Sequence, residues 1–309
     1  MNHSHKKFNL EYKASFTTHD EKNEMRVWFV VPSSALGQKV ESFSITPEPT
    51  SKYRDEQGNT ILYFQVCNIK RFVICAHIQV TLWKYDEVKN ERKVYSINDR
   101  KKSLWRYLRD EPFLEHTSDV KNLAHQLVSP GKTNVGIIRS LFLFIVTHFI
   151  YSYPVKKRGV RNLVLSALKG DCGEYSSLFV TLCRILKIPA RNNTGFVIFP
   201  KQKIVTEHGW SSIYIKPIGW VEYDTQFASL EKNVSAGIQK YFGCRSDYRI
   251  SFTNGFNIPL RPTIPRGFDL KYWNKRGLPL THKSVQTLQP VVFVSRKQVR
   301  FKENIHILG

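Results

Sequence analysis

The sequence is poor in cysteine, in acidic residues and in long apolar runs. Its five cysteines, an odd number without close pairing, argue against a disulfide framework and favour a reducing compartment. No apolar stretch follows the N-terminal residues as a secretion signal would require, so we expect a cytoplasmic location. The apolar run at residues 141–146 is too short to span a bilayer. No acidic loop has calcium-ligand spacing, so we expect no metal and no cofactor.

Because acidic residues are scarce, 47 lysines and arginines outweigh 25 aspartates and glutamates, and the net charge is +22. Such a surplus favours acidic partners, although a basic surface can also serve solubility alone. The charge is spread along the chain, and no nucleic-acid-binding motif is present. We therefore expect a protein or peptide substrate of acidic character, while binding of nucleic acid stays open.

One stretch has the pattern of a helix with a reactive start. Its apolar residues repeat with the period of one helix face, at Leu178, Phe179, Leu182, Ile185 and Leu186. Asp171 precedes them, with Glu174 three residues further on, which predicts that Asp171 caps the helix. Cys172 then lies in the first turn, where unpaired N–H groups and the helix dipole favour a thiolate. The pattern indicates a cysteine nucleophile, although most cysteines are simply small apolar residues.

Two later segments add a base and a carboxylate. Residues 207–215 and 219–226 both alternate between apolar and polar side chains, and Pro217 and Gly219 indicate a turn between them. We expect an antiparallel hairpin with His208 at the start of one strand and Asp224 at the end of the other. A histidine oriented by a carboxylate, with a thiol elsewhere in the chain, is the arrangement that activates a nucleophile.

These segments together resemble the transglutaminase-like superfamily, and most of all its bacterial branch of cysteine-protease-like proteins. The shared motifs are Gly170–Cys172, Leu186–Arg191, His208–Trp210 and Gly219–Asp224. The resemblance extends from about residue 10 to about residue 295. Two positions depart from the family pattern: Gly209 stands where alanine is commoner, and Thr225 follows Asp224 where proline is commoner.

The resemblance implies an α+β fold with a papain-like transglutaminase core and a cysteine enzyme. Cys172 would attack an amide, His208 would transfer the proton, and Asp224 would orient His208. The bacterial branch favours hydrolysis, as by a peptidase or amidase, and acyl transfer to an amine stays open. The alternative is a catalytically silent scaffold that uses the cleft to bind an acidic partner.

The segment before Cys172 offers further candidates. In the family this region lies near the mouth of the active site, so Tyr151 is a candidate for holding the oxyanion, with simple packing as the alternative. Four basic residues follow, and we expect them to line the rim where substrate enters: Lys156, Lys157, Arg158 and Arg161. A rim of one sign would concentrate acidic substrates.

The N-terminal part has the alternation of strands. Residues 26–32, 60–66 and 72–83 predict an antiparallel β-sandwich, which we assign to residues 1–97. Cys75 and His77 share one face of the third strand, where packing is expected, because no third metal ligand is near in sequence. Residues 98–309 are assigned to the catalytic domain with a C-terminal extension. Within it we expect helices after Thr117, at 133–151 and at 230–241, a last strand at 291–294 and an exposed basic tail at 296–300.

Overall fold

The computed structural model describes residues 5–86, 102–270 and 279–308. The chain forms two compact units. Unit 1 comprises Met1–Trp83, Thr194–His208 and Asp247–Gly309, and unit 2 comprises Lys84–Asn193 and Gly209–Ser246. The boundary predicted between residues 97 and 98 lies outside the described residues. The segment from Asp247 onward belongs with the N-terminal strands, which corrects the prediction that it extends the catalytic domain.

Unit 1 contains the predicted antiparallel sandwich, built from two four-stranded sheets. The first sheet has the strand order β18 (Arg300–Leu308), β1 (His5–Thr17), β6 (Arg71–Trp83) and β3 (Gln38–Thr46). The second has the order β17 (Val291–Ser295), β2 (Glu24–Val31), β5 (Thr60–Cys67) and β4 (Ser51–Arg54). Alternation along β1 buries every second side chain, from Phe8 to Phe16, against the other sheet.

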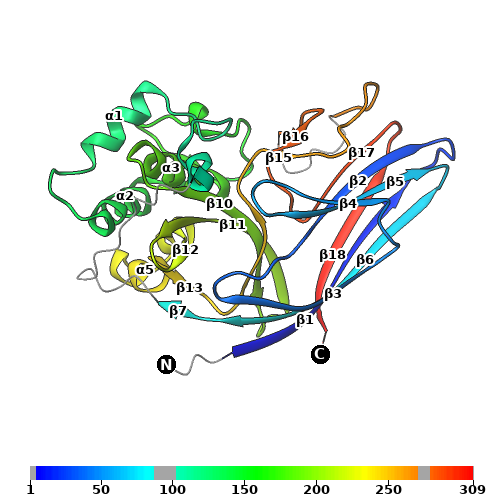
Figure 1. The fold of residues 1–309 in the computed structure, drawn as a ribbon, viewed down its shortest axis with the longest axis horizontal. Helices are drawn as coiled ribbons and strands as arrows, with labels where there is room; N and C mark the ends of the chain where they lie inside the picture. The colour runs from blue at the N-terminus through cyan, green and yellow to red at the C-terminus, as the bar shows by residue number, and fades with distance from the viewer. Residues whose placement is uncertain (1–4, 87–101, 271–278, 309) are drawn as a thin grey trace. The chain divides into compact units, whose positions relative to one another are not determined.

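The two ends of the chain meet in this sandwich. Figure 1 shows β18, in red, running beside β1, in dark blue, and Phe16 of β1 pairs with Phe301 of β18. Phe16 also packs edge-on against Phe293 of β17, with ring centroids 5.0 Å apart. The predicted exposed tail at 296–300 is therefore followed by a full edge strand, which the sequence analysis missed because its partner lies almost the whole chain away.

The remaining strands of unit 1 are short or continue into unit 2. They are β14 (Arg249–Asn254), β15 (Ile258–Pro259) and β16 (Ser284–Val285). Two longer strands, β10 (Ala190–Phe199) and β11 (Ile204–Ile215), belong partly to each unit. Gly195 of β10 has to be glycine, because a Cβ there would lie 2.0 Å from the carbonyl oxygen of Ile250 in β14.

Unit 2 holds the helices. They are α1 (Ser118–Gln126), α2 (Asn134–His148), α3 (Cys172–Ile185), α4 (Thr225–Ser229) and α5 (Val234–Tyr241), with 3₁₀ turns η1 (Lys102–Leu108) and η2 (Val160–Asn162). Its strands are β7 (Tyr85–Asp86), β8 (Ile150–Tyr151), β9 (Lys169–Gly170), β12 (Gly219–Tyr223) and β13 (Cys244–Arg245). The helix expected at 230–241 begins later, at Val234, because Asn233 caps α5 by accepting the N–H of Ala236.

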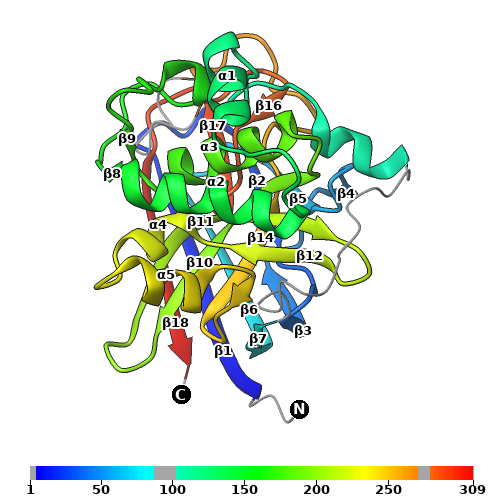
Figure 2. The same ribbon diagram turned by 90° about the vertical axis from the view of Figure 1, so that its left-hand side faces the viewer.

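An aromatic cluster forms the core of unit 2. Phe142 of α2 packs edge-on against Phe179 of α3 and against Phe242, and Tyr223 contacts all three rings. Figure 2 shows α1, α2 and α3 grouped together, and both α1 and α2 contact α3. The core thus holds α3, with Cys172 at its first residue, in a fixed position. No helix in the described part of the chain is long and apolar enough to cross a membrane.

Candidate active site

The start of α3 has the predicted cap. Asp171 has extended backbone angles, and its Oδ1 accepts the N–H of Gly173 at 2.8 Å. Cys172 is the first helical residue and is half-buried. The cap therefore fixes the thiol at the end of the helix where backbone N–H groups are left without helical partners.

A buried arginine anchors this cap. The two terminal nitrogens of Arg158 donate to Asp171 at 3.1 and 2.7 Å, and one of them also donates to Glu174 at 2.9 Å. The side chains of Arg158, Asp171 and Glu174 are only 5%, 9% and 1% exposed. The predicted substrate-rim role of Arg158 is therefore wrong, because its charge is engaged beneath the helix start. In the sequence, the only sign of this buried role for Arg158 was that two carboxylates, Asp171 and Glu174, follow it.

Gly170 makes room for this cluster. It belongs to β9, which pairs in parallel with β8, so that Tyr151 lies opposite Gly170. A Cβ on Gly170 would lie 2.6 Å from the Cβ of Glu174. The small residue before the cap is thus required for Glu174 to reach Arg158.

The two carboxyl groups of the cluster have opposite pKa shifts. Burial and the hydrogen bond and charge of Asp171 raise the pKa of Glu174 to about 8. Burial also disfavours ionisation of Asp171, but hydrogen bonds from Arg158 and Glu174 hold its pKa below the usual value. At neutral pH the Glu174 carboxyl group therefore keeps its proton, while the neighbouring Asp171 is ionised.

The Cys172 thiol has a raised pKa, whereas the sequence predicted that its position at the helix start would favour the thiolate. Burial, followed by the charge of Asp171, raises its pKa to about 12, and Asp224 and Glu174 add to the shift. The backbone N–H of Gly209 donates to the sulfur and opposes the rise without cancelling it. Burial and the nearby carboxylates disfavour the thiolate, so the thiol by itself rests protonated and needs a base to become a nucleophile.

The predicted hairpin is confirmed. β11 and β12 pair antiparallel, with Ser211 opposite Tyr223 at the last pair of the ladder. Beyond that pair lies Asp224, which is 1% exposed and caps α4 by accepting the N–H of Phe227 at 3.0 Å. His208, which is 3% exposed, directly precedes Gly209 in β11. The pairing of the His208 ring with the Cys172 sulfur, and with Asp224, stays a prediction.

Polar side chains that the sequence analysis missed connect α3 to the neighbouring strands. Asn192 of β10 donates to the hydroxyl of Ser176 at 2.8 Å, and the Ser211 hydroxyl of β11 donates to the Ser176 carbonyl at 3.4 Å. Asn193 donates to Ser212 one position along the same strands. Each of these residues is buried, so the bonds hold β10 and β11 at a fixed height along α3.

Tyr151 lies within electrostatic reach of the thiol. Its side chain is half-exposed in β8, and burial and then the charge of Cys172 raise its pKa. Like any tyrosine hydroxyl at neutral pH it carries a proton, so it can donate a hydrogen bond. Lys156, Lys157 and Arg161 are exposed, in keeping with the expected rim, although their contact with a substrate stays a prediction.

Comparisons with known proteins find one matching family and similar folds. Residues 121–225 match the transglutaminase-like superfamily. A solved structure of a candidate cysteine protease from Cytophaga hutchinsonii aligns over 99% of this chain and 93% of its own, at 12% identity and a TM-score of 0.61. This likeness shows a shared fold and bears out the expected α+β class.

Two further structures are of the periplasmic domain of TgpA from Pseudomonas aeruginosa. One aligns over 75% of this chain and 93% of its own, at 14% identity and a TM-score of 0.41. The other, bound to ethylmercury, aligns over 71% and 90%, at 15% identity and a TM-score of 0.39. A comparison with curated protein sequences finds no match.

Proposed function

Because residues 121–225 give this chain a transglutaminase-like core, we propose that it is a cysteine enzyme acting on amide bonds through Cys172, His208 and Asp224. The observation that carries the proposal is the position of Cys172. Its sulfur lies at the start of a capped helix and accepts the N–H of Gly209, the residue next to His208. A thiol, a base and a carboxylate on neighbouring elements are what covalent catalysis requires.

The reaction follows from the protonation state of the thiol. His208 takes the Cys172 proton as the sulfur attacks the amide carbon, and Asp224 stabilises the imidazolium that forms. The oxyanion of the tetrahedral intermediate accepts hydrogen bonds from backbone N–H groups at the start of α3 and from the Tyr151 hydroxyl. The C–N bond then breaks, His208 returns the proton to the leaving amine, and a thioester on Cys172 remains.

The group that attacks the thioester in the second half of the reaction determines which of two products forms. Attack by water on the thioester releases a carboxylic acid and restores the thiol, whereas attack by an amine forms a new amide. We favour water, and therefore a peptidase or amidase, because the family resemblance is greatest to the protease-like branch.

A catalytically silent scaffold is the second candidate. The observation that favours it is the Cys172 thiol itself, whose pKa of about 12 leaves it protonated at neutral pH. If His208 does not take the proton, the site can bind an acidic chain without cleaving it.

Turnover separates the two candidates. The purified chain is incubated with casein-derived peptides, with and without a fluorescent alkylamine, and the release of new amino groups and the incorporation of the amine are both measured. We expect new amino groups to form, and Cys172→Ala to reduce the rate at least about 10⁴-fold. Cys67→Ser, which removes an exposed thiol of unit 1, should leave the rate unchanged. Equal rates in wild type and Cys172→Ala would support the scaffold.

A further inference from the structure

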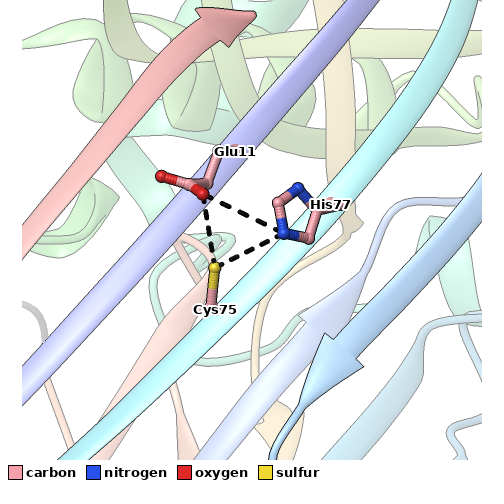
Figure 3. Close-up of side chains that lie close together, drawn as sticks. All are labelled: Glu11, Cys75 and His77. Atoms are coloured by element: carbon pink, nitrogen blue, oxygen red, sulfur yellow. Dashed lines mark hydrogen bonds and ion pairs between the residues drawn. The ribbon is translucent and has the colours of Figure 1, made fainter.

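A second cysteine lies among groups that bind metals, on the outer face of the sandwich. Cys75 and His77 of β6 and Glu11 of β1 direct their side chains to the same side of the sheet, as Figure 3 shows. Glu11 lies directly opposite His77 in the strand pairing, and Cys75 is two residues along the same strand. Glu11 is the third ligand that the sequence spacing could not reveal, because it is brought in by the neighbouring strand.

The three donor atoms converge on one point. The Cys75 sulfur is 3.6 Å from Oε2 of Glu11 and 3.7 Å from Nε2 of His77, and these last two atoms are 3.9 Å apart. Tetrahedral zinc, with bonds of about 2.0 to 2.3 Å, would hold its sulfur, nitrogen and oxygen ligands about 3.4 to 3.6 Å apart. The separations are therefore within about half an ångström of a zinc site, a difference that side-chain rotation can close.

From this geometry we propose that Glu11, Cys75 and His77 form a zinc-binding site. Sulfur and imidazole donors suit zinc and are poor ligands for calcium or magnesium. A thiolate and a carboxylate balance the two charges of the ion. The side chains of Glu11 and His77 are 29% and 53% exposed, so the ion can enter from solvent and water can complete its coordination.

Binding exchanges a proton for the metal. Without the ion, the Cys75 thiol donates a hydrogen bond to Glu11, and burial together with the Glu11 charge raises its pKa. Zinc replaces that proton, which passes to the buffer, while His77 binds as the neutral imidazole. Lys13, which lies opposite Cys75 in the strand pairing, favours the thiolate. The ion would link β1 to β6 and thus stabilise the sheet.

Calorimetry with zinc chloride tests the site. The full chain is used in reduced, metal-free form and with the substitution Cys172→Ala, so that the thiol at the start of α3 cannot bind the ion. We expect one zinc per chain and release of about one proton, determined from the binding heat in buffers of different ionisation enthalpy. Replacement of zinc by cobalt(II) should produce a sulfur-to-cobalt charge-transfer band and tetrahedral visible bands.

Single substitutions identify the ligands. In the same background, Cys75→Ser should remove the charge-transfer band and weaken zinc binding by about 100-fold or more, and His77→Ala and Glu11→Gln should each weaken it by at least about 10-fold. Cys67→Ser is the matched control, since it removes an exposed thiol at the end of β5. Circular dichroism confirms that each variant is folded.

Two outcomes would overturn the proposal. The first is the absence of zinc binding in the folded parent chain at micromolar protein. The second is unchanged affinity in both Cys75→Ser and His77→Ala, which would place the ion elsewhere. A rise in melting temperature on addition of zinc, present in the parent and lost in Cys75→Ser, would support the site by a readout that does not depend on binding heat.

Discussion

The start of α3 and the outer face of the sandwich place a thiol beside carboxylates in two different ways. Cys172 lies with Asp171, Glu174 and Asp224 in buried surroundings, and burial with these charges raises its pKa to about 12. Cys75 lies beside one carboxylate and one imidazole on a face that is open to solvent. Both thiols rest protonated, but the groups around them favour different ways of losing the proton.

The difference lies in what can remove the proton. At Cys75 a divalent ion from solvent can replace it, because three donors already converge on one point. At Cys172 the carboxylates are occupied, two of them by Arg158 and one as the cap of α4, so the proton has to pass to a base. A thiol beside carboxylates thus suits catalysis when a histidine can accept its proton and suits metal binding when the ligands face solvent.

Removing the buried arginine should have the largest effect on unit 2. Arg158→Ala leaves Asp171 and Glu174 buried without their cation, and we expect the free energy of unfolding to fall by about 3 kcal/mol. Urea denaturation measures it. The neighbouring, exposed Lys156→Ala should change stability by less than about 0.5 kcal/mol. Similar losses in both variants would show that Arg158 does not anchor the cap.

Tyr151→Phe tests the catalytic side of this comparison, namely whether the Tyr151 hydroxyl stabilises the oxyanion. The Tyr151 hydroxyl can donate a hydrogen bond to an oxyanion, and its loss should lower kcat about 10- to 100-fold with little change in KM. Tyr153→Phe, at a similarly exposed position two residues on, is the matched control. An unchanged kcat in Tyr151→Phe would leave Tyr151 with a packing role only.

Glu174→Gln tests the shared proton at the cap. Glu174 has a pKa of about 8 in the folded chain against an ordinary value of 4.5, so the folded state binds the extra proton between these pH values. Wild-type stability should therefore fall as pH rises from about 4.5 to 8, relative to Glu174→Gln, whose neutral amide does not titrate. Denaturation of both proteins at several pH values measures this, and parallel pH profiles would contradict it.

The rim should give the smallest effect. Replacing Lys156, Lys157 and Arg161 by alanine should reduce the preference for acidic over basic peptides a few-fold, measured as a ratio of kcat/KM values. The preference should also fade above about 0.15 M salt, where the Debye length is about 8 Å. A matched set removes three exposed charges from unit 1, at Lys22, Lys52 and Lys283. Equal changes in both sets would leave only a net-charge effect.

The sequence correctly predicted the features that depend on residues close together in the chain. The cap at Asp171, the start of α3 at Cys172 and the hairpin turn before Gly219 follow from residues a few positions apart, and all were predicted. The anchor Arg158, the metal ligand Glu11 and the edge strand β18 were not. Each depends on a partner on another element, 13 to 291 positions away in the contacts Arg158–Asp171, Cys75–Glu11 and Tyr12–Glu303. The pKa of Cys172 was misjudged for a related reason, because burial, the largest cause of its rise, depends on the elements that pack around the thiol.

The central claim is that His208 removes the proton of Cys172, and alkylation of the protein by iodoacetamide at neutral pH tests it most directly. Peptide mass spectrometry follows each cysteine in wild type and in His208→Ala, with Cys67 as the internal reference. We predict that Cys172 is alkylated fastest in wild type, because His208 accepts its proton as the sulfur attacks, and at least about 100-fold more slowly in His208→Ala, because burial and the nearby carboxylates disfavour a thiolate that has no base beside it. Equal Cys172 rates in the two proteins, or slower labelling of Cys172 than of Cys67 in wild type, would contradict the account.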